Sequence, residues 1–169
     1  LSNWNVGGYA TGAALANHLV GYDLDVNEAE IGITLNSSSS SWYYGTDGST
    51  PFNQYDFVTV VLHEVGHGLE FYDGLTLSGD YYFGVEGRYD QFLEIGNGDD
   101  FTAMTDAQRA AAITSNDVYW NGANATAANS GSQVKIYAPN PVESGSSISH
   151  VDLATHGSAL MAPQLSSGN

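Results

Sequence analysis

Two histidines and a glutamate occupy one short stretch of the chain, His63-Glu64-Val65-Gly66-His67. If this stretch is helical, His63 and His67 lie one turn apart on the same face, so their imidazoles can bind one ion. Neutral imidazole nitrogen is a preferred ligand of Zn²⁺. Glu64, next to the first histidine, can take a proton from a zinc-bound water and pass it to a leaving amine. The pattern predicts a hydrolytic zinc site, with two hydrogen-bonded core histidines as the alternative.

The helix that must position this stretch is predicted to run from about Gln54 to Tyr72. Its residues are nearly all apolar, a composition typical of a buried rather than a surface helix. Asp73 and Gly74 follow, and an Asp-Gly pair is a good signal for the end of a helix. We therefore expect both histidines to lie in the interior, where imidazoles without a partner would be costly.

A hydrolytic zinc site usually has three protein ligands and one water, so a third ligand must come from elsewhere in the chain. Asp73 lies ten residues after His63, which is one known spacing for a third ligand. The same residue also fits an ordinary turn that closes the helix. The remaining histidines are His18, His150 and His156. The residues alone leave these four candidates open.

The segment 63–71 (HEVGHGLEF), followed much later by His150 and by 159–163 (ALMAP), resembles the leishmanolysin-type metzincins of the secreted bacterial kind. In that family the third histidine follows a long insertion and precedes the methionine of the Met-turn by eleven residues, the interval from His150 to Met161 here. The resemblance covers 58–71 and 146–163; between them only 89–93 looks similar.

This resemblance implies a zinc-dependent endopeptidase that acts on proteins or peptides. It implies that zinc is bound by His63, His67 and His150 and that Glu64 is the general base. Met161 would form an apolar floor under the metal without binding it, because a soft thioether adds little to a site rich in nitrogen. The segment 162–164 would line the pocket for the leaving-group side of the substrate. With this resemblance His150 ranks first as third ligand, Asp73 second and His156 third.

The sequence departs from the family at Glu70, where the family usually has the glycine of a sharp turn. In one interpretation the helix continues to Gly74 and Glu70 faces solvent or supports a ligand. In another, Glu70 contacts the metal or orients a ligand. We favour the first interpretation, because carboxylates on helices are usually solvated. The path of the backbone after His67 is the open question.

Composition sets wider limits on function. The chain has 169 residues, 42% of them apolar, which suits one domain over residues 1–169. Nineteen acidic and three basic residues give a net charge of −16, which disfavours nucleic acid as a partner. Cysteine is absent, which excludes disulfides and thiolate zinc sites. No apolar run is long enough to span a membrane. We expect a secreted monomer.

The fold class expected is α/β (α+β) and metzincin-like, with a twisted mixed sheet, a central zinc-binding helix and a loop-rich lower lobe. The upper lobe would include about 1–73 and the lower lobe about 74–169. Apolar patterns and turn residues predict further elements. These are helices at 10–20 and 105–113, and strands in the second half of 24–35, at 42–44 and at 134–137.

Calcium is a second cation to consider, because acidic chains favour divalent ions. Asp23-x-Asp25-x-Asn27 begins like a calcium loop, but Glu28 stands where an EF-hand needs glycine. The segment 96–100 (GNGDD) could supply carboxylates and carbonyls, although such runs are more often solvated loops. A different class of function also fits the composition: a secreted binding module in which metal has only a structural role.

Overall fold

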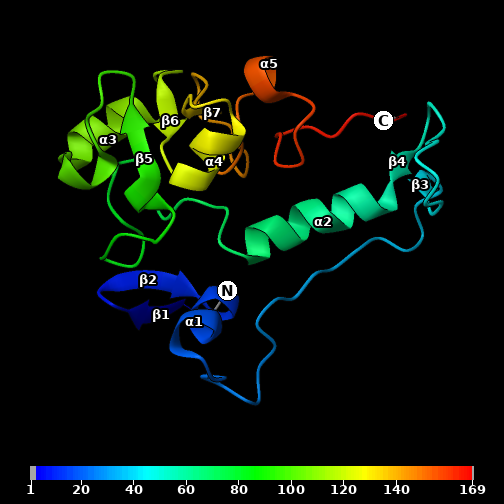
Figure 1. Cartoon of the computed structure of the whole chain (residues 1–169), viewed down its shortest axis with the longest axis horizontal. Helices are drawn as coiled ribbons and strands as arrows, with labels where there is room; N and C mark the ends of the chain where they lie inside the picture. Colours follow the sequence, from blue (N-terminus) through cyan, green and yellow to red (C-terminus); the bar gives the residue numbers. More distant parts are fainter. Residues whose placement is uncertain (1–2, 169) are drawn as a thin grey trace.

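The computed structural model describes residues 3–168 and has a mixed α/β fold with small sheets (Figure 1). The mixed class agrees with the sequence prediction. The single twisted sheet does not, because the strands within 3–168 form three separate sheets. The α-helices are α1 (Ala13–Val20), α2 (Phe57–Gly68), α3 (Asp106–Ala112), α4 (Ala123–Ala128) and α5 (Leu153–His156). Within residues 3–168 no helix combines the length and apolar character needed to cross a membrane.

The first sheet is an antiparallel hairpin of β1 (Asn3–Val6) and β2 (Tyr9–Gly12), with α1 following directly. The helix predicted at 10–20 is therefore partly a strand. The second sheet pairs β3 (Trp42–Tyr43) in parallel with β4 (Tyr55–Asp56). The strand expected in 24–35 was wrong: this segment has no regular secondary structure and connects α1 to β3 as an extended chain (Figure 1).

The third sheet belongs to the main hydrophobic core. It consists of β5 (Leu93–Ile95), β6 (Val118–Trp120) and β7 (Val134–Ile136), antiparallel and in the order β5-β6-β7. Two short 3₁₀ helices, Asp90–Phe92 and Phe101–Ala103, flank β5. The core residues all lie within the segment assigned by sequence to the lower lobe: Tyr89, Leu93, Phe101, Met104, Ala112, Ile113, Val118, Ile136, Ala138 and Ile148.

The C-terminal end of α2 lies between the β1–β2–α1 unit and the β5–β7 sheet, and the helix extends from there away from both, toward β3 and β4 (Figure 1). It begins after Asp56, whose carboxylate accepts the Thr59 N–H at 2.8 Å and so caps the helix. The expectation of a buried helix was wrong, because His63 is its only buried residue and Leu62 is 50% exposed. Its apolar residues at 58, 62, 65 and 69 recur on the face opposite the histidines, and no element within residues 3–168 covers that face fully.

The helix ends earlier than predicted, at Gly68, in a motif that uses Glu70 in place of glycine. The Glu70 N–H donates to the His67 carbonyl at 3.0 Å, and the Phe71 N–H donates to the Gly66 carbonyl at 3.1 Å. These two bonds define a Schellman motif, which needs a left-handed residue at the Glu70 position. Glu70 has the required φ of 80°. The helix therefore does not continue to Gly74.

An aromatic cluster joins the end of α2 to the core. The Phe71 ring packs edge-on against Tyr89 and Trp120, with ring centroids 5.2 and 5.0 Å away. Tyr89 and Trp120 also contact each other at 5.2 Å. Such ring pairs add about 0.5–1.5 kcal/mol each beyond the apolar area they bury. The cluster holds the residues that follow His67 in a fixed position against the β5–β7 sheet.

Arg109 is a buried basic residue on α3, and its side chain connects this helix to two loops. Thr105 caps this helix together with Gln108, at the start of the helix that the sequence predicts at 105–113. The Arg109 guanidinium donates to the Gly79, Phe101 and Met104 carbonyls and pairs with Asp106. It is 5% exposed. Its removal would therefore leave the buried Gly79 and Met104 carbonyls without this donor, whereas the Phe101 carbonyl would still accept the Met104 N–H.

We expect Arg109→Ala to lower the free energy of unfolding by about 3 kcal/mol, because buried carbonyls that lose a charged donor carry their full desolvation cost. Urea denaturation of the two proteins measures this difference. Lys135→Ala is the matched control, since Lys135 is only partly buried, and it should change stability by less than about 1 kcal/mol. A loss below about 1 kcal/mol for Arg109→Ala would contradict the prediction.

Candidate metal centre

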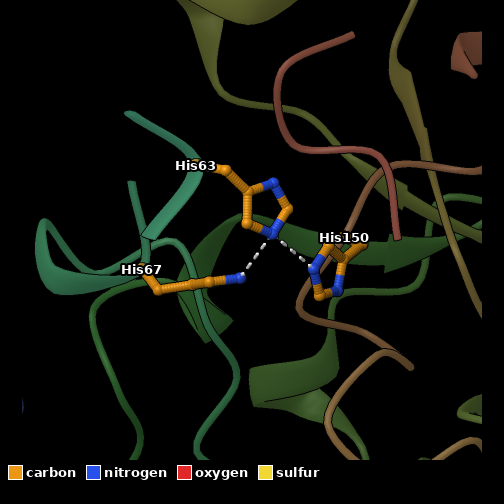
Figure 2. A group of neighbouring side chains, drawn as sticks. All are labelled: His63, His67 and His150. Atoms are coloured by element: carbon orange, nitrogen blue, oxygen red, sulfur yellow. Dashed lines mark hydrogen bonds between the residues drawn. The ribbon is translucent and has the colours of Figure 1, made fainter. Parts of the chain in front are cut away.

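His63 and His67 project from the same face of α2, as their spacing predicts (Figure 2). Their Nε2 atoms are 3.2 Å apart. The Nδ1 atom of His63 is 2.7 Å from the Leu160 carbonyl, and that of His67 is 2.7 Å from the Phe71 carbonyl. A carbonyl can only accept, so each Nδ1 carries the proton and each Nε2 presents a lone pair.

His150 comes from a tight turn before α5 and completes a group of three imidazoles (Figure 2). Its Nε2 atom is 3.1 Å from that of His63. Its Nδ1 atom donates to the Ser146 carbonyl at 2.8 Å, which again leaves the lone pair on Nε2. Backbone bonds hold the turn against Tyr137, the residue that follows β7 (Val134–Ile136): the Tyr137 N–H donates to the His150 carbonyl, and the Ile148 N–H donates to the Tyr137 carbonyl.

The three ring nitrogens that face one another are all acceptors, and this fits a cation. Neutral imidazole has one ring proton, and in His63, His67 and His150 the carbonyls described above hold it at Nδ1. No proton is left to bridge the three Nε2 atoms. Those of His67 and His150 lie 3.2 and 3.1 Å from that of His63. Ligand nitrogens around a tetrahedral Zn²⁺ with bonds of about 2.05 Å are about 3.3 Å apart. The triad can therefore bind a metal ion of this size.

Electrostatics keep His150 in the state that a ligand needs. Burial, helped by the neighbouring imidazoles, lowers the pKa of His150 to about 4, against the opposing effect of the Ser146 carbonyl. At neutral pH this ring is therefore uncharged and its Nε2 lone pair is free to bind a cation. His150 is 4% exposed, and an imidazolium there would be costly.

Met161 packs directly beneath α2, between the two histidine positions. A Cβ atom on Gly66 would lie 2.5 Å from the Met161 sulfur, so only glycine permits this approach. The neighbouring Leu160 carbonyl holds His63, and the Met161 carbonyl accepts the Val151 N–H. The segment that carries Met161 thus contacts both α2 and the residue after His150. Its role as a floor under a metal remains a prediction.

The other predicted residues lie outside the triad. Glu64 is exposed on α2. Its role as general base stays a prediction, because the positions of the imidazoles do not test it. Among the rival ligands, the Asp73 carboxylate accepts from Leu75 N–H and Ser149 Oγ instead. His156 ends α5, and His18 is exposed on α1. Within residues 3–168, only the three histidines form a group of such ligands with converging atoms.

Glu70 neither faces solvent nor joins the triad, so both interpretations of this residue need correction. It is 7% exposed, and its carboxylate accepts the Gly12 N–H at 2.5 Å. Gly12 precedes the first residue of α1, so this bond ties the end of α2 to the start of α1. Burial raises the pKa of Glu70, which the Gly12 bond and Arg88 partly offset. The Glu70 carboxylate therefore contacts the start of α1, and it does not belong to the histidine group.

The two segments that could bind calcium, 23–27 and 96–100, do not bring carboxylates together around one point. Asp23 and Asp25 accept from the backbone N–H two residues further on, as in ordinary Asx turns. In the segment 96–100, the Asn97 side-chain oxygen accepts the Asp99 N–H in the same way, and the Asp99 carboxylate accepts from the Asn97 side-chain amide. Within the described chain, neither segment gathers three carboxylates around one point.

Asp90 is a buried carboxylate that sequence analysis missed, because only the fold brings its partners together. It is fully buried, and its two oxygens accept from Gly74 N–H at 3.2 Å and Gly87 N–H at 2.9 Å. Burial, and then the nearby Asp73 charge, raises the pKa of Asp90 to about 7 against the effect of the two backbone donors. No local signal in 89–93 distinguishes such a residue from a surface aspartate.

The raised pKa of Asp90 predicts a fall in stability as pH rises. The folded protein binds this proton more tightly than the unfolded chain, so the stabilisation is complete below about pH 4 and lost as pH rises through 7. Asp90→Asn cannot ionise. We expect the difference in free energy of unfolding between wild type and Asp90→Asn to shrink from pH 4 to pH 7, by at most about 4 kcal/mol, because only the wild type loses stability over this range. Urea denaturation with chelator present, so that bound metal does not contribute, measures it; a constant difference across this range would contradict it.

The chain matches no protein family, no curated protein sequence and no solved structure. The imidazole geometry and the short motifs around it are therefore what indicate the chemistry of the site.

Proposed function

We propose that the chain is a zinc-dependent endopeptidase in which His63, His67 and His150 bind the metal. The observation that carries this proposal is the convergence of three imidazole Nε2 lone pairs, with every Nδ1 proton donated to a backbone carbonyl. Orientation of this kind, by carbonyl groups behind the ligands, is typical of metal-binding histidines. Without a cation, three lone pairs would face one another at a net cost.

Glu64 has the proposed role of general base. When bound by three imidazoles, zinc polarises a peptide carbonyl and lowers the pKa of water to about 7. Glu64 follows the first ligand on α2, and its side chain is exposed. Its carboxylate would take the proton of the attacking water, hold it, and release it to the leaving amine. The buried ring of His150, whose pKa is lowered to about 4 by burial, stays neutral and does not compete for that proton.

The number of ligands favours catalysis over a structural metal site. Structural zinc sites usually have four protein ligands, whereas hydrolytic sites have three and leave one position for water or substrate. In residues 3–168 the group contains three side chains, and neither Asp73 nor His156 belongs to it. The alternative, a secreted module that uses metal only for stability, would need a fourth protein ligand.

The short motifs support a leishmanolysin-like metzincin, and with it secretion, protein or peptide substrates and a monomeric state. Met161, the methionine of the proposed Met-turn, lies beside Gly66 of α2. A cavity of about 180 Å³ adjoins α2 near Thr59 and Val60, with Leu160 and Gln164 on its other wall. Of the predicted pocket segment 162–164, only Gln164 lines it. A substrate side chain could bind there, one turn before His63.

The test measures metal content and hydrolysis on the same purified protein. We expect one zinc per chain, cleavage of casein, loss of cleavage with 1,10-phenanthroline and recovery when Zn²⁺ is added back. Bound zinc without cleavage of a panel of proteins and peptides would favour the binding module. Absence of bound zinc after incubation with Zn²⁺ would overturn the metal site itself.

A further inference from the structure

The three imidazoles come from two segments that are far apart in sequence, α2 and the turn that contains His150. Contacts between these segments must therefore hold His150 close to the other two histidines. His63 and His67 are fixed by α2 and its capped ends. His150 is the last residue of a turn, residues 146–150, that has no regular secondary structure. The position of His150 relative to α2 therefore depends on contacts between this turn and the residues that follow α2.

Asp73 and Ser149 supply such a contact through two hydrogen bonds. The Ser149 hydroxyl donates to Asp73 Oδ2 at 2.9 Å and accepts the Asp73 backbone N–H at 3.2 Å. The other Asp73 oxygen accepts the Leu75 N–H at 3.0 Å. The next residue, Gly74, donates to the buried Asp90. The Asp73 side chain is thus held in place on its own segment and reaches across to the residue before His150.

The turn needs such support because its backbone is strained. Ile148 has a φ of 66°, in the left-handed region that β-branched residues strongly disfavour. Conformations of this kind persist when surrounding contacts over-determine them. The Tyr89 hydroxyl donates to the Ile148 carbonyl at 2.8 Å on one side, and the Asp73–Ser149 pair holds the next residue. Relaxation of Ile148 would rotate the chain immediately before His150.

We propose that Asp73 and Ser149 are positioning residues that hold His150 at the place where it binds zinc, an inference that rests on the proposed function. Asp73 acts through Ser149 and does not bind the metal. This assignment gives a role to the carboxylate that sequence spacing offered as a rival third ligand. It also predicts opposite behaviour for Asp73→Ala and Asp73→Asn. The amide oxygen of asparagine can still accept the Leu75 N–H, and its NH2 group can donate to the Ser149 hydroxyl, so the contact is kept, but an amide is a poor zinc ligand.

The experiment measures zinc affinity by competition with a chromophoric chelator, without any assay of hydrolysis. We expect Asp73→Ala and Ser149→Ala each to weaken zinc binding by about 10-fold or more, the range known for residues that orient metal ligands. Their double variant should lose little more than either single variant, because both remove the same contact. Asp73→Asn should stay within about 3-fold of wild type, far less than the loss from removing the contact. Ser78→Ala, which removes a serine–aspartate hydrogen bond to Asp80, is the matched control and should have no effect.

Other outcomes overturn the proposal. If Ser149→Ala binds zinc as wild type does, the pair does not position His150. If Asp73→Asn loses as much affinity as Asp73→Ala while Ser149→Ala is unaffected, Asp73 is itself a ligand. Circular dichroism of each variant excludes unfolding as the cause, and Ser149→Ala is mild enough to fold. Failure of wild type to bind zinc would instead refute the proposed function, and the positioning role with it.

Discussion

Glu64→Gln should bind zinc like the wild-type protein and hydrolyse peptides about 10²–10⁴-fold more slowly, the usual contribution of a general base. The amide has the shape of the carboxylate but cannot accept the proton of the attacking water. Because Glu64 is exposed on α2 and its neighbour His63 is held by the Leu160 carbonyl, the substitution leaves the imidazoles in place. Zinc stoichiometry and kcat on one peptide substrate, measured for both proteins, give the comparison.

Glu28→Gln provides the matched control, since Glu28 is another exposed glutamate far from α2 in the chain. It should retain full activity. A Glu64→Gln protein with near wild-type kcat would remove Glu64 from the mechanism. A variant that loses zinc along with activity would show that Glu64 supports the metal site, which the role of general base does not predict.

His150→Ala should weaken zinc binding by more than about 100-fold, because a ligand contributes more than the residues that only orient it. The imidazole is 4% exposed and its Nε2 atom lies 3.1 Å from that of His63, so no other side chain can replace it without movement of the turn. Equilibrium dialysis against buffered Zn²⁺ measures the affinity. Hydrolysis should fall in parallel, because His63 and His67 alone leave the site with two ligands.

His156→Ala is the control that separates the two C-terminal histidines. His156 lies at the end of α5, outside the triad, and its removal should leave zinc affinity unchanged. If His156→Ala loses zinc and His150→Ala keeps it, the ligand assignment is wrong. Equal losses in both variants would indicate damage to the shared segment, which thermal denaturation of the metal-free proteins would reveal.

Local signals in the sequence were enough to predict helices with clear ends. Thr105 and Gln108 form the capping box of α3, and the histidine stretch is helical as its spacing required. The end of α2 was misjudged because Glu70 takes a conformation that usually needs glycine, and its cost is offset by a partner 58 residues away, Gly12. No pattern in the segment 63–74 reports that distant contact.

For the candidate site, the two histidines on α2 could be found from their spacing alone. From the sequence, His150 could be chosen over Asp73 and His156 only through its interval to Met161, which comes from a family motif. The structure brings His150 to His63 and His67. Asp90 and Ser149 could not be found, because their contacts join segments that are distant along the chain. Hydrogen bonds of this kind become visible only when the fold is known.

The aromatic cluster of Phe71, Tyr89 and Trp120 has a mechanical consequence for α2. It anchors the C-terminal end of the helix, and the Phe71 carbonyl also orients His67, so this end moves as one body with the β5–β7 sheet. The N-terminal turn packs instead through Phe57 against Trp42 and Tyr44, which do not belong to the β5–β7 sheet, and it borders the 180 Å³ cavity. Any opening that admits a bulky polypeptide is therefore expected at the start of α2, with the hinge close to its histidines.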